Sequence, residues 1–317
     1  MKKNEQIKPR SAGTVAGKES SSKGQEKQPS SAPGRLKIAI QKSGRLNEGS
    51  LKLLKDCGIF IDNGRDQLMA PSQNFPLDVL FLRNSDIPQY VEDGVADAAI
   101  IGDNLLIEKQ KKVEVVQKLG FSRCRVSMAV PKNAEYSGPE FFQGKKIATS
   151  YPNTLKKFLK KNNVQAEIHE ISGSVEIAPR IGLADGICDI VSSGSTLFKN
   201  GLKEVETFLN SEAVLIRSLH LDPVREEILE KLVFRIRSVL EAKNSKYILM
   251  NVPNEKIQEV TRLLPVLKSP TVMPLAMKGW SSLHTVIKED TFWEVIDRLK
   301  NAGAQGILVV PIEKMVI

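Results

Sequence analysis

Short apolar runs alternate with segments of helical periodicity over most of this 317-residue chain. The apolar runs predict strands at residues 36–40, 76–82, 98–101, 125–130, 145–149, 166–171 and 187–191. Helices are predicted from residue 46 and at residues 87–93, 155–161 and 175–183. Strands that alternate with helices predict parallel sheets with helices on their faces. Because the pattern shifts after residue 123, we expect two α/β lobes that bind ligands at the carboxyl ends of their strands.

The pattern changes again in the last quarter of the chain. A charged helix at residues 224–242 precedes strands at residues 246–251, 271–276, 284–287 and 306–310, with a helix after the first and the third of these strands. The order βαββαβ is typical of the ferredoxin-like, split-βαβ unit. The sequence therefore divides into an N-terminal extension at residues 1–34, a two-lobed region at residues 35–242 and a C-terminal domain at residues 243–317.

The segment at residues 172–197 carries the clearest chemical signal. A strand at residues 187–191, interrupted only by Asp189, leads into the sequence SSGST, and helical character follows at residues 197–205. We call residues 192–196 the serine loop. A strand, a turn of small residues and a helix in this order direct backbone N–H groups and the positive end of a helix dipole toward one point. This arrangement favours a bound phosphate, and an ordinary N-cap of a surface helix is the alternative.

The N-terminal extension accounts for much of the positive charge. The net charge is +9, and residues 1–34 contain seven basic and three acidic residues. This extension has no aromatic residue and is rich in Ser, Gly, Lys and Gln, so we predict that it is disordered. The remaining charge suits a protein that binds polyphosphates. With 5% aromatic residues and no zinc-finger spacing, nucleic-acid binding is not predicted.

Cysteine spacing and hydropathy indicate the compartment. Cys57, Cys124 and Cys188 are odd in number and far apart, which matches neither a disulfide framework nor a zinc site. No apolar run approaches the roughly 18 residues that a membrane-spanning helix needs. We therefore predict a cytoplasmic protein that does not bind a membrane.

Six motifs occur in a fixed order along the chain. They are QKSGRL at 41–46, RNSDIP at 83–88, GVADAAIIGD at 94–103, KIATSYP at 146–152, the segment at 172–197, and EKM at 313–315. Together they resemble ATP phosphoribosyltransferase of histidine biosynthesis, in its long form with a C-terminal regulatory domain. The similarity spans residues 35–317, which is nearly the whole chain after the extension.

The resemblance implies a fold, a reaction and partners. The fold would be a two-lobed catalytic region, similar to periplasmic binding proteins, with a ferredoxin-like regulatory domain. The enzyme would transfer the phosphoribosyl group of phosphoribosyl pyrophosphate (PRPP) to N1 of ATP and release pyrophosphate, as the first step of histidine biosynthesis. Mg²⁺ would accompany the pyrophosphate, with protein ligands that the sequence does not identify. Inhibition by histidine and a homo-oligomer, a hexamer with dimers as the smaller form, are also implied.

The resemblance also implies roles for particular residues. PRPP would be bound by Glu176, Asp189, Ser192, Ser193, Gly194, Ser195 and Thr196. ATP or pyrophosphate would be bound by Lys42, Arg45, Arg83 and Tyr151. Histidine would be bound by Ser269, Pro270 and Thr271.

Each of these side chains also has a structural interpretation. Asp189 could cap a turn, and Glu176 could complement a helix dipole. Solvated surface charge is the usual state of residues such as Lys42 and Arg45. Arg83 could end a strand in a salt bridge, and Tyr151 could lie on a rim.

Two other functions fit parts of the sequence. A phosphoribosyltransferase that acts on a free base would show two adjacent acids before its loop, whereas Asp189 stands alone. A ligand-binding or sensory protein of the two-lobed fold needs no catalytic groups, but its transport version would need a secretion signal, which the sequence lacks.

Overall fold

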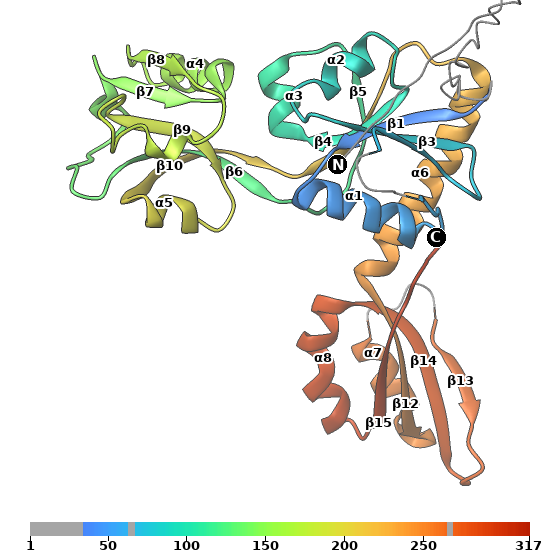
Figure 1. Cartoon of the computed structure of the whole chain (residues 1–317). Coiled ribbons are helices and arrows are strands. Elements are labelled where there is room, and N and C mark those ends of the chain that lie inside the picture. The colour runs from blue at the N-terminus through green and yellow to red at the C-terminus, as the bar shows by residue number, and fades with distance from the viewer. Residues whose placement is uncertain (1–33, 63–66, 265–268) are drawn as a thin grey trace, which may run out of the picture. The chain divides into compact units, whose positions relative to one another are not determined.

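The structure is a computed structural model that describes residues 34–62, 67–264 and 269–317. The extension at residues 1–34, predicted to be disordered, therefore lies outside the described residues except for Gly34. The described strands form three sheets (Figure 1). Two of these sheets are mixed in direction, rather than parallel as predicted, and the C-terminal one is antiparallel. None of the described helices is long and apolar enough to cross a membrane.

The first sheet belongs to the first lobe. In order across the sheet, its strands are β2 (Met69–Pro71), β3 (Leu77–Leu82), β1 (Leu36–Gln41), β4 (Ala98–Gly102), β11 (Ala213–Arg217) and β5 (Glu114–Lys118). The three central strands β3, β1 and β4 are parallel, and β11 lies antiparallel between β4 and β5. The carboxyl ends of β1 and β3 therefore meet at one edge, with Gln41 opposite Leu82.

Helices cover both faces of this sheet. They are α1 (Arg45–Asp56), α2 (Ile87–Glu92), α3 (Asp103–Lys109) and α6 (Pro223–Lys243). Alternate residues of a strand point to opposite faces. Ile38 and its alternate neighbours on β1 are buried with residues of α1 and α6, whereas Ala39 is buried with residues of α2 and α3. The apolar residues of β1 are therefore buried on both faces of the sheet.

The second sheet belongs to the second lobe. Across the sheet, its strands are β10 (Leu202–Ser211), β6 (Cys124–Pro131), β9 (Gly186–Val191), β7 (Lys146–Thr149) and β8 (Glu167–Glu170). The α-helices of this lobe are α4 (Pro152–Lys161) and the short α5 (Ser195–Lys199), and 3₁₀ turns lie at Pro139–Phe142 and Val175–Ile177. The chain enters this lobe after β5 and returns to the first sheet through β11. The two-lobed α/β fold is thereby confirmed.

The C-terminal domain forms its own sheet and core. It contains β12 (Ser245–Pro253), the 3₁₀ turn Asn254–Lys256, α7 (Ile257–Leu263), β13 (Thr271–Pro274), β14 (Trp280–Lys288), α8 (Glu289–Asn301) and β15 (Gln305–Pro311). The strand order is β13-β14-β12-β15. Met250 on β12 is buried with Val260 of α7 and Leu299 of α8, so both helices pack on the same face of the sheet (Figure 1). The predicted βαββαβ order is confirmed.

Two predicted helices differ from the structure. The helix predicted at residues 175–183 is only the 3₁₀ turn Val175–Ile177, because Pro179 lacks an N–H and Gly182 adopts a left-handed φ of 76°. The helical character predicted at residues 197–205 ends at Lys199, because Gly201 turns the chain at a φ of 73° into β10. Strands β2, β5, β10 and β11 and helix α3 were not predicted.

Candidate active site

The serine loop joins β9 to α5 in the second lobe. Gly194 has a φ of 77°, in the left-handed region that favours glycine, and the helix begins at the next residue. The Ser193 and Ser195 hydroxyl oxygens lie 3.0 Å apart, and the Ser195 N–H donates to Ser193 Oγ at 3.4 Å. Ser192, Ser193 and Ser195 are exposed, as is Thr196. The loop thus presents exposed hydroxyl-bearing side chains, which an anion site can use.

Two carboxylates accompany the loop. Asp189, near the end of β9, is half-buried, and its Oδ1 accepts a hydrogen bond from the Ile190 N–H at 2.7 Å. Burial raises the pKa of Asp189 to about 6, and the charge of Glu176 adds to the rise. An electrostatic effect of this kind requires that the two carboxylates lie near each other. They could accept hydrogen bonds from sugar hydroxyls, and their roles remain predictions.

Tyr151 lies on the N-terminal side of α4 and is buried, with 8% of its surface exposed. Burial raises the pKa of its hydroxyl, and the charge of Asp189 adds to the rise. A hydrogen bond with the Asn104 side chain acts in the opposite direction. The burial disagrees with a rim position and leaves little of the ring open for stacking on a base in this conformation.

Arg45, the first residue of α1, connects the two groups of predicted substrate residues. Its Nη1 donates to Ser192 Oγ at 2.7 Å, across 147 positions of sequence. A side chain predicted to bind ATP or pyrophosphate therefore contacts the first residue of the loop predicted to bind PRPP. The contact brings together one residue from each of the two predicted sets.

Lys42 and Arg83 follow β1 and β3 at the same edge of the first sheet. The Lys42 N–H donates to the Leu82 carbonyl at 2.8 Å, and both cationic side chains are exposed. Within the described ranges, no acidic side chain lies within 4.0 Å of the charged nitrogens of Lys42, Arg45 or Arg83. These cations therefore have no internal counter-ion in that part of the chain and could bind an anionic ligand.

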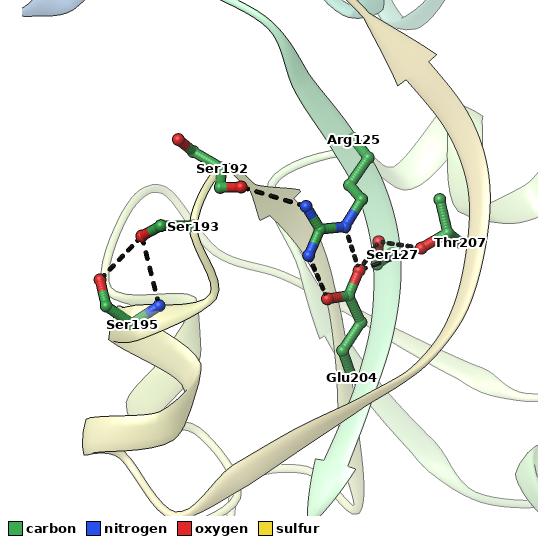
Figure 2. Close-up of polar contacts among 7 residues, drawn as sticks. All are labelled: Arg125, Ser127, Ser192, Ser193, Ser195, Glu204 and Thr207. Atoms are coloured by element: carbon green, nitrogen blue, oxygen red, sulfur yellow. Dashed lines mark hydrogen bonds and ion pairs between the residues drawn. The ribbon is translucent and has the colours of Figure 1, made fainter.

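Sequence reasoning did not identify Asn104, Arg125 or Glu204. Arg125 and Glu204 form an ion pair beside the serine loop (Figure 2). A signal for this pair was available, because Arg125 and Ser127 are polar residues on the same face of an otherwise apolar strand. The partner on β10 could not be read from the sequence.

The residues predicted to bind histidine belong to the C-terminal sheet. Ser269 and Pro270 precede β13, and Thr271 begins it, in the C-terminal sheet. Thr271 pairs with His284 of β14. The structure thus assigns them to a different sheet from the serine loop and the cations of the first lobe.

The carboxylates near the serine loop could also contribute to a metal site. In residues 34–62, 67–264 and 269–317, no group of three or more His, Cys, Asp or Glu side chains is arranged to hold a metal ion. Mg²⁺ commonly keeps several waters and binds through substrate phosphates with one or two carboxylates. The pair Asp189 and Glu176 fits that smaller requirement.

Comparisons with known proteins agree with the sequence motifs. The family model "ATP phosphoribosyltransferase" matches residues 83–238, and the model "HisG, C-terminal domain" matches residues 242–314. An ATP phosphoribosyltransferase of Cytophaga hutchinsonii is 59% identical over 281 residues, covering 89% of this chain and 98% of the relative. The corresponding protein of Bacteroides thetaiotaomicron is 54% identical over 282 residues, covering 89% of this chain and 100% of the relative.

A solved structure agrees as well. The ATP phosphoribosyl transferase (HisG:HisZ) complex from Thermotoga maritima superposes with a TM-score of 0.57 at 27% identity, covering 65% of this chain and 98% of that one. The chain therefore belongs to the ATP phosphoribosyltransferase family of histidine biosynthesis, in the long form that carries a C-terminal domain.

Proposed function

We propose that this enzyme joins N1 of the ATP adenine to C1 of the PRPP ribose and releases pyrophosphate. The hydrogen bond from Arg45 to Ser192 is the observation that carries the proposal, since it joins the cationic edge of the first lobe to the serine loop of the second. A reaction between two polyphosphate substrates requires both kinds of group at one place.

The residues would act mainly by positioning and by charge stabilisation. As the C1–oxygen bond breaks, its electron pair leaves with pyrophosphate, positive charge develops on the ribose, and the N1 lone pair forms the new bond. The serine loop would hold the 5-phosphate, and Asp189 and Glu176 would accept hydrogen bonds from ribose hydroxyls. Lys42, Arg45 and Arg83 would stabilise the charge on the departing pyrophosphate. Because N1 already carries a lone pair, no general base is needed at the start.

Mg²⁺ would supply further charge neutralisation for the pyrophosphate when it is bound. Phosphate oxygens would provide most of its ligands, and Asp189 and Glu176 would be the candidate protein carboxylates. The protein's contribution would be to hold these two side chains and the loop in place.

Regulation and assembly belong to the C-terminal domain in this proposal. Histidine would bind near Ser269, Pro270 and Thr271 and inhibit a cytoplasmic enzyme that assembles as a hexamer, with dimers as the smaller form. The boundary between catalytic and regulatory regions would fall at residues 242–243, where α6 ends at Lys243 and β12 begins at Ser245.

The direct test is release of pyrophosphate from ATP and PRPP by the purified chain with Mg²⁺. We expect pyrophosphate and phosphoribosyl-ATP in equal amounts, and none when either substrate is omitted. Release of pyrophosphate with a free base in place of ATP would support the alternative phosphoribosyltransferase. Binding of PRPP without turnover in the presence of ATP would contradict an enzyme.

A further inference from the structure

Arg125 on β6 contacts both an acidic side chain and the serine loop. Its Nε and Nη2 donate to the two carboxylate oxygens of Glu204 on β10, each at 2.5 Å. Its Nη1 donates to the main-chain carbonyl of Ser192 at 3.0 Å (Figure 2). One edge of the guanidinium is thus fixed by Glu204, and the remaining nitrogen, Nη1, binds the carbonyl of the first residue of the loop.

Two hydroxyls fix Glu204 in turn. Ser127 Oγ donates to Glu204 Oε1 at 2.7 Å, Thr207 Oγ1 donates to the same oxygen at 3.0 Å, and the two hydroxyls lie 3.1 Å apart. In a regular strand, Glu204 and Thr207 would point to opposite faces, because their separation is odd. The shift in pairing between Glu204 and Glu206 brings both side chains to the face of Ser127. The irregular strand therefore builds the support for Arg125.

The ion pair also determines what Arg125 can do. The Arg125 guanidinium holds the pKa of Glu204 at about 2, so the carboxylate stays charged at any working pH. Because its charge is already matched, Arg125 is a poorer phosphate ligand than Lys42, Arg45 or Arg83, which lack an acidic partner among the described residues. Its contact with Ser192 is therefore better explained by an effect on the loop than by direct binding of substrate.

We propose that Arg125, fixed by Glu204, is a positioning residue that orients the serine loop for a phosphate group. In a planar trans peptide the C=O and the next N–H point in opposite directions. When Arg125 holds the Ser192 carbonyl, the Ser193 N–H is directed away from Arg125 and is fixed as a donor for an anion. The loop is then organised before the ligand arrives, which avoids the entropic cost of ordering it on binding.

The test compares Arg125→Met, which removes the donors but keeps much of the length, with Arg217→Met. Arg217 forms an ion pair of the same fork geometry with Glu226 on α6, remote from the loop, so it controls for loss of a bidentate pair. In the full chain without ligand, amides of residues 193–196 should exchange hydrogen about tenfold faster in Arg125→Met. The PRPP Kd and KM should rise roughly tenfold, with the ATP affinity unchanged. Arg217→Met should change neither the loop amides nor PRPP binding.

Two milder variants test the proposal if Arg125→Met does not fold. Arg125→Lys keeps the charge and one donor and should restore part of the PRPP affinity, and Glu204→Gln should weaken it by freeing the guanidinium. Unchanged loop exchange and unchanged PRPP affinity in a folded Arg125 variant would overturn the proposal. An equal loss in Arg217→Met would do the same, because the effect would then be general destabilisation.

The PRPP part of this inference rests on the proposed function, and the two can be separated. If the unaltered chain binds no PRPP, the proposed function fails. The exchange measurement still decides whether Arg125 orders the loop, because it needs no ligand. Faster exchange in Arg125→Met but not in Arg217→Met then supports the positioning role, and equal exchange in the two variants rejects it.

Discussion

The edge of the first sheet and the serine loop of the second lobe offer different groups to a ligand. The first edge has Lys42, Arg45 and Arg83, which are exposed and have no acidic partner in the described parts of the chain. Around the loop, the residues that carry hydroxyls are exposed, and the nearby cation Arg125 is matched by Glu204. A cation without a counter-ion can exchange water for an anionic ligand, whereas a matched one stabilises the protein around it.

On the proposed function, this difference would divide the binding of the two substrates between the lobes. The unmatched cations suit the pyrophosphate and triphosphate groups, whose charge is high. The loop suits a single phosphate, which it would bind by geometry more than by net charge. Ser192 links the two regions, since Arg45 donates to its hydroxyl and Arg125 donates to its carbonyl.

The largest expected effect is on the loop itself. Gly194→Val should reduce PRPP binding below detection while the chain remains folded. The added Cβ would meet Val191 Cγ1 only at 4.0 Å, so crowding is slight, but a φ of 77° strains a β-branched residue by roughly 1–3 kcal/mol. Calorimetric titration with PRPP measures the loss. Gly182→Val, at a φ of 76° with nothing within 4 Å of the added Cβ, is the control for backbone strain alone.

The next effect concerns the cationic edge. Arg45→Ala should weaken ATP or pyrophosphate binding by about 1.5–3 kcal/mol, the range for a hydrogen bond to a charged group. Steady-state KM for ATP and product inhibition by pyrophosphate measure this loss. Arg298→Ala, an exposed arginine on α8, removes the same charge at a distance. Unaltered kinetics in the Arg45 variant would assign Arg45 to surface charge and would remove the contrast between the two regions.

A truncation tests whether the two lobes are sufficient for substrate binding. A chain that ends at Lys243 should keep its affinity for ATP and PRPP and lose inhibition by histidine, and its assembly should change. In the intact chain, histidine and the substrates should alter each other's affinity by equal factors. The coupling free energy that corresponds to such a factor is typically about 1–3 kcal/mol. Equal inhibition of both chains would reject a regulatory C-terminal domain. Unchanged assembly together with lost inhibition would separate regulation from oligomerisation.

The smallest effect is a pH dependence carried by Asp189. With a pKa of about 6, its carboxylate is protonated as the pH falls below 6, and PRPP affinity should be roughly tenfold lower at pH 5 than at pH 8. Asp189→Asn should bind PRPP weakly at both pH values. Because the folded pKa lies above the unfolded one, this group's contribution to stability is lost as the pH rises from about 4 to about 6. Asp189→Asn should therefore raise the melting temperature at pH 8, and a lower one would contradict a buried charge.

Much of the fold was predictable where burial is nearly complete. Strands β1, β4 and β9 are mostly apolar in sequence, and each lies within about two residues of its prediction. Strand β10 was missed because it is half-exposed and irregular, so its side chains show no period of two. The helix predicted at residues 175–183 was wrong because the apolar spacing was given more weight than Pro179 and Gly182.

The site was predictable only in part. The serine loop is a contiguous stretch of small residues after a strand, and its place in the fold follows from local sequence. The pairing of Arg125 with Glu204 spans 79 positions and depends on the register of two antiparallel strands, which no local pattern specifies. For the same reason, the contact between Arg45 and Ser192 appeared only in the structure.

The place of β11 in the first sheet has a consequence for the order of folding. The second lobe is a contiguous stretch from β6 to β10, and it can form its sheet as soon as those residues leave the ribosome. Strand β5 is synthesised earlier but hydrogen-bonds to β11, so it cannot pair until nearly a hundred residues of intervening chain have been synthesised. Long-range pairing of this kind is slow and leaves a strand edge exposed to association with other chains. The first lobe, although synthesised first, should therefore be the later of the two to complete its fold.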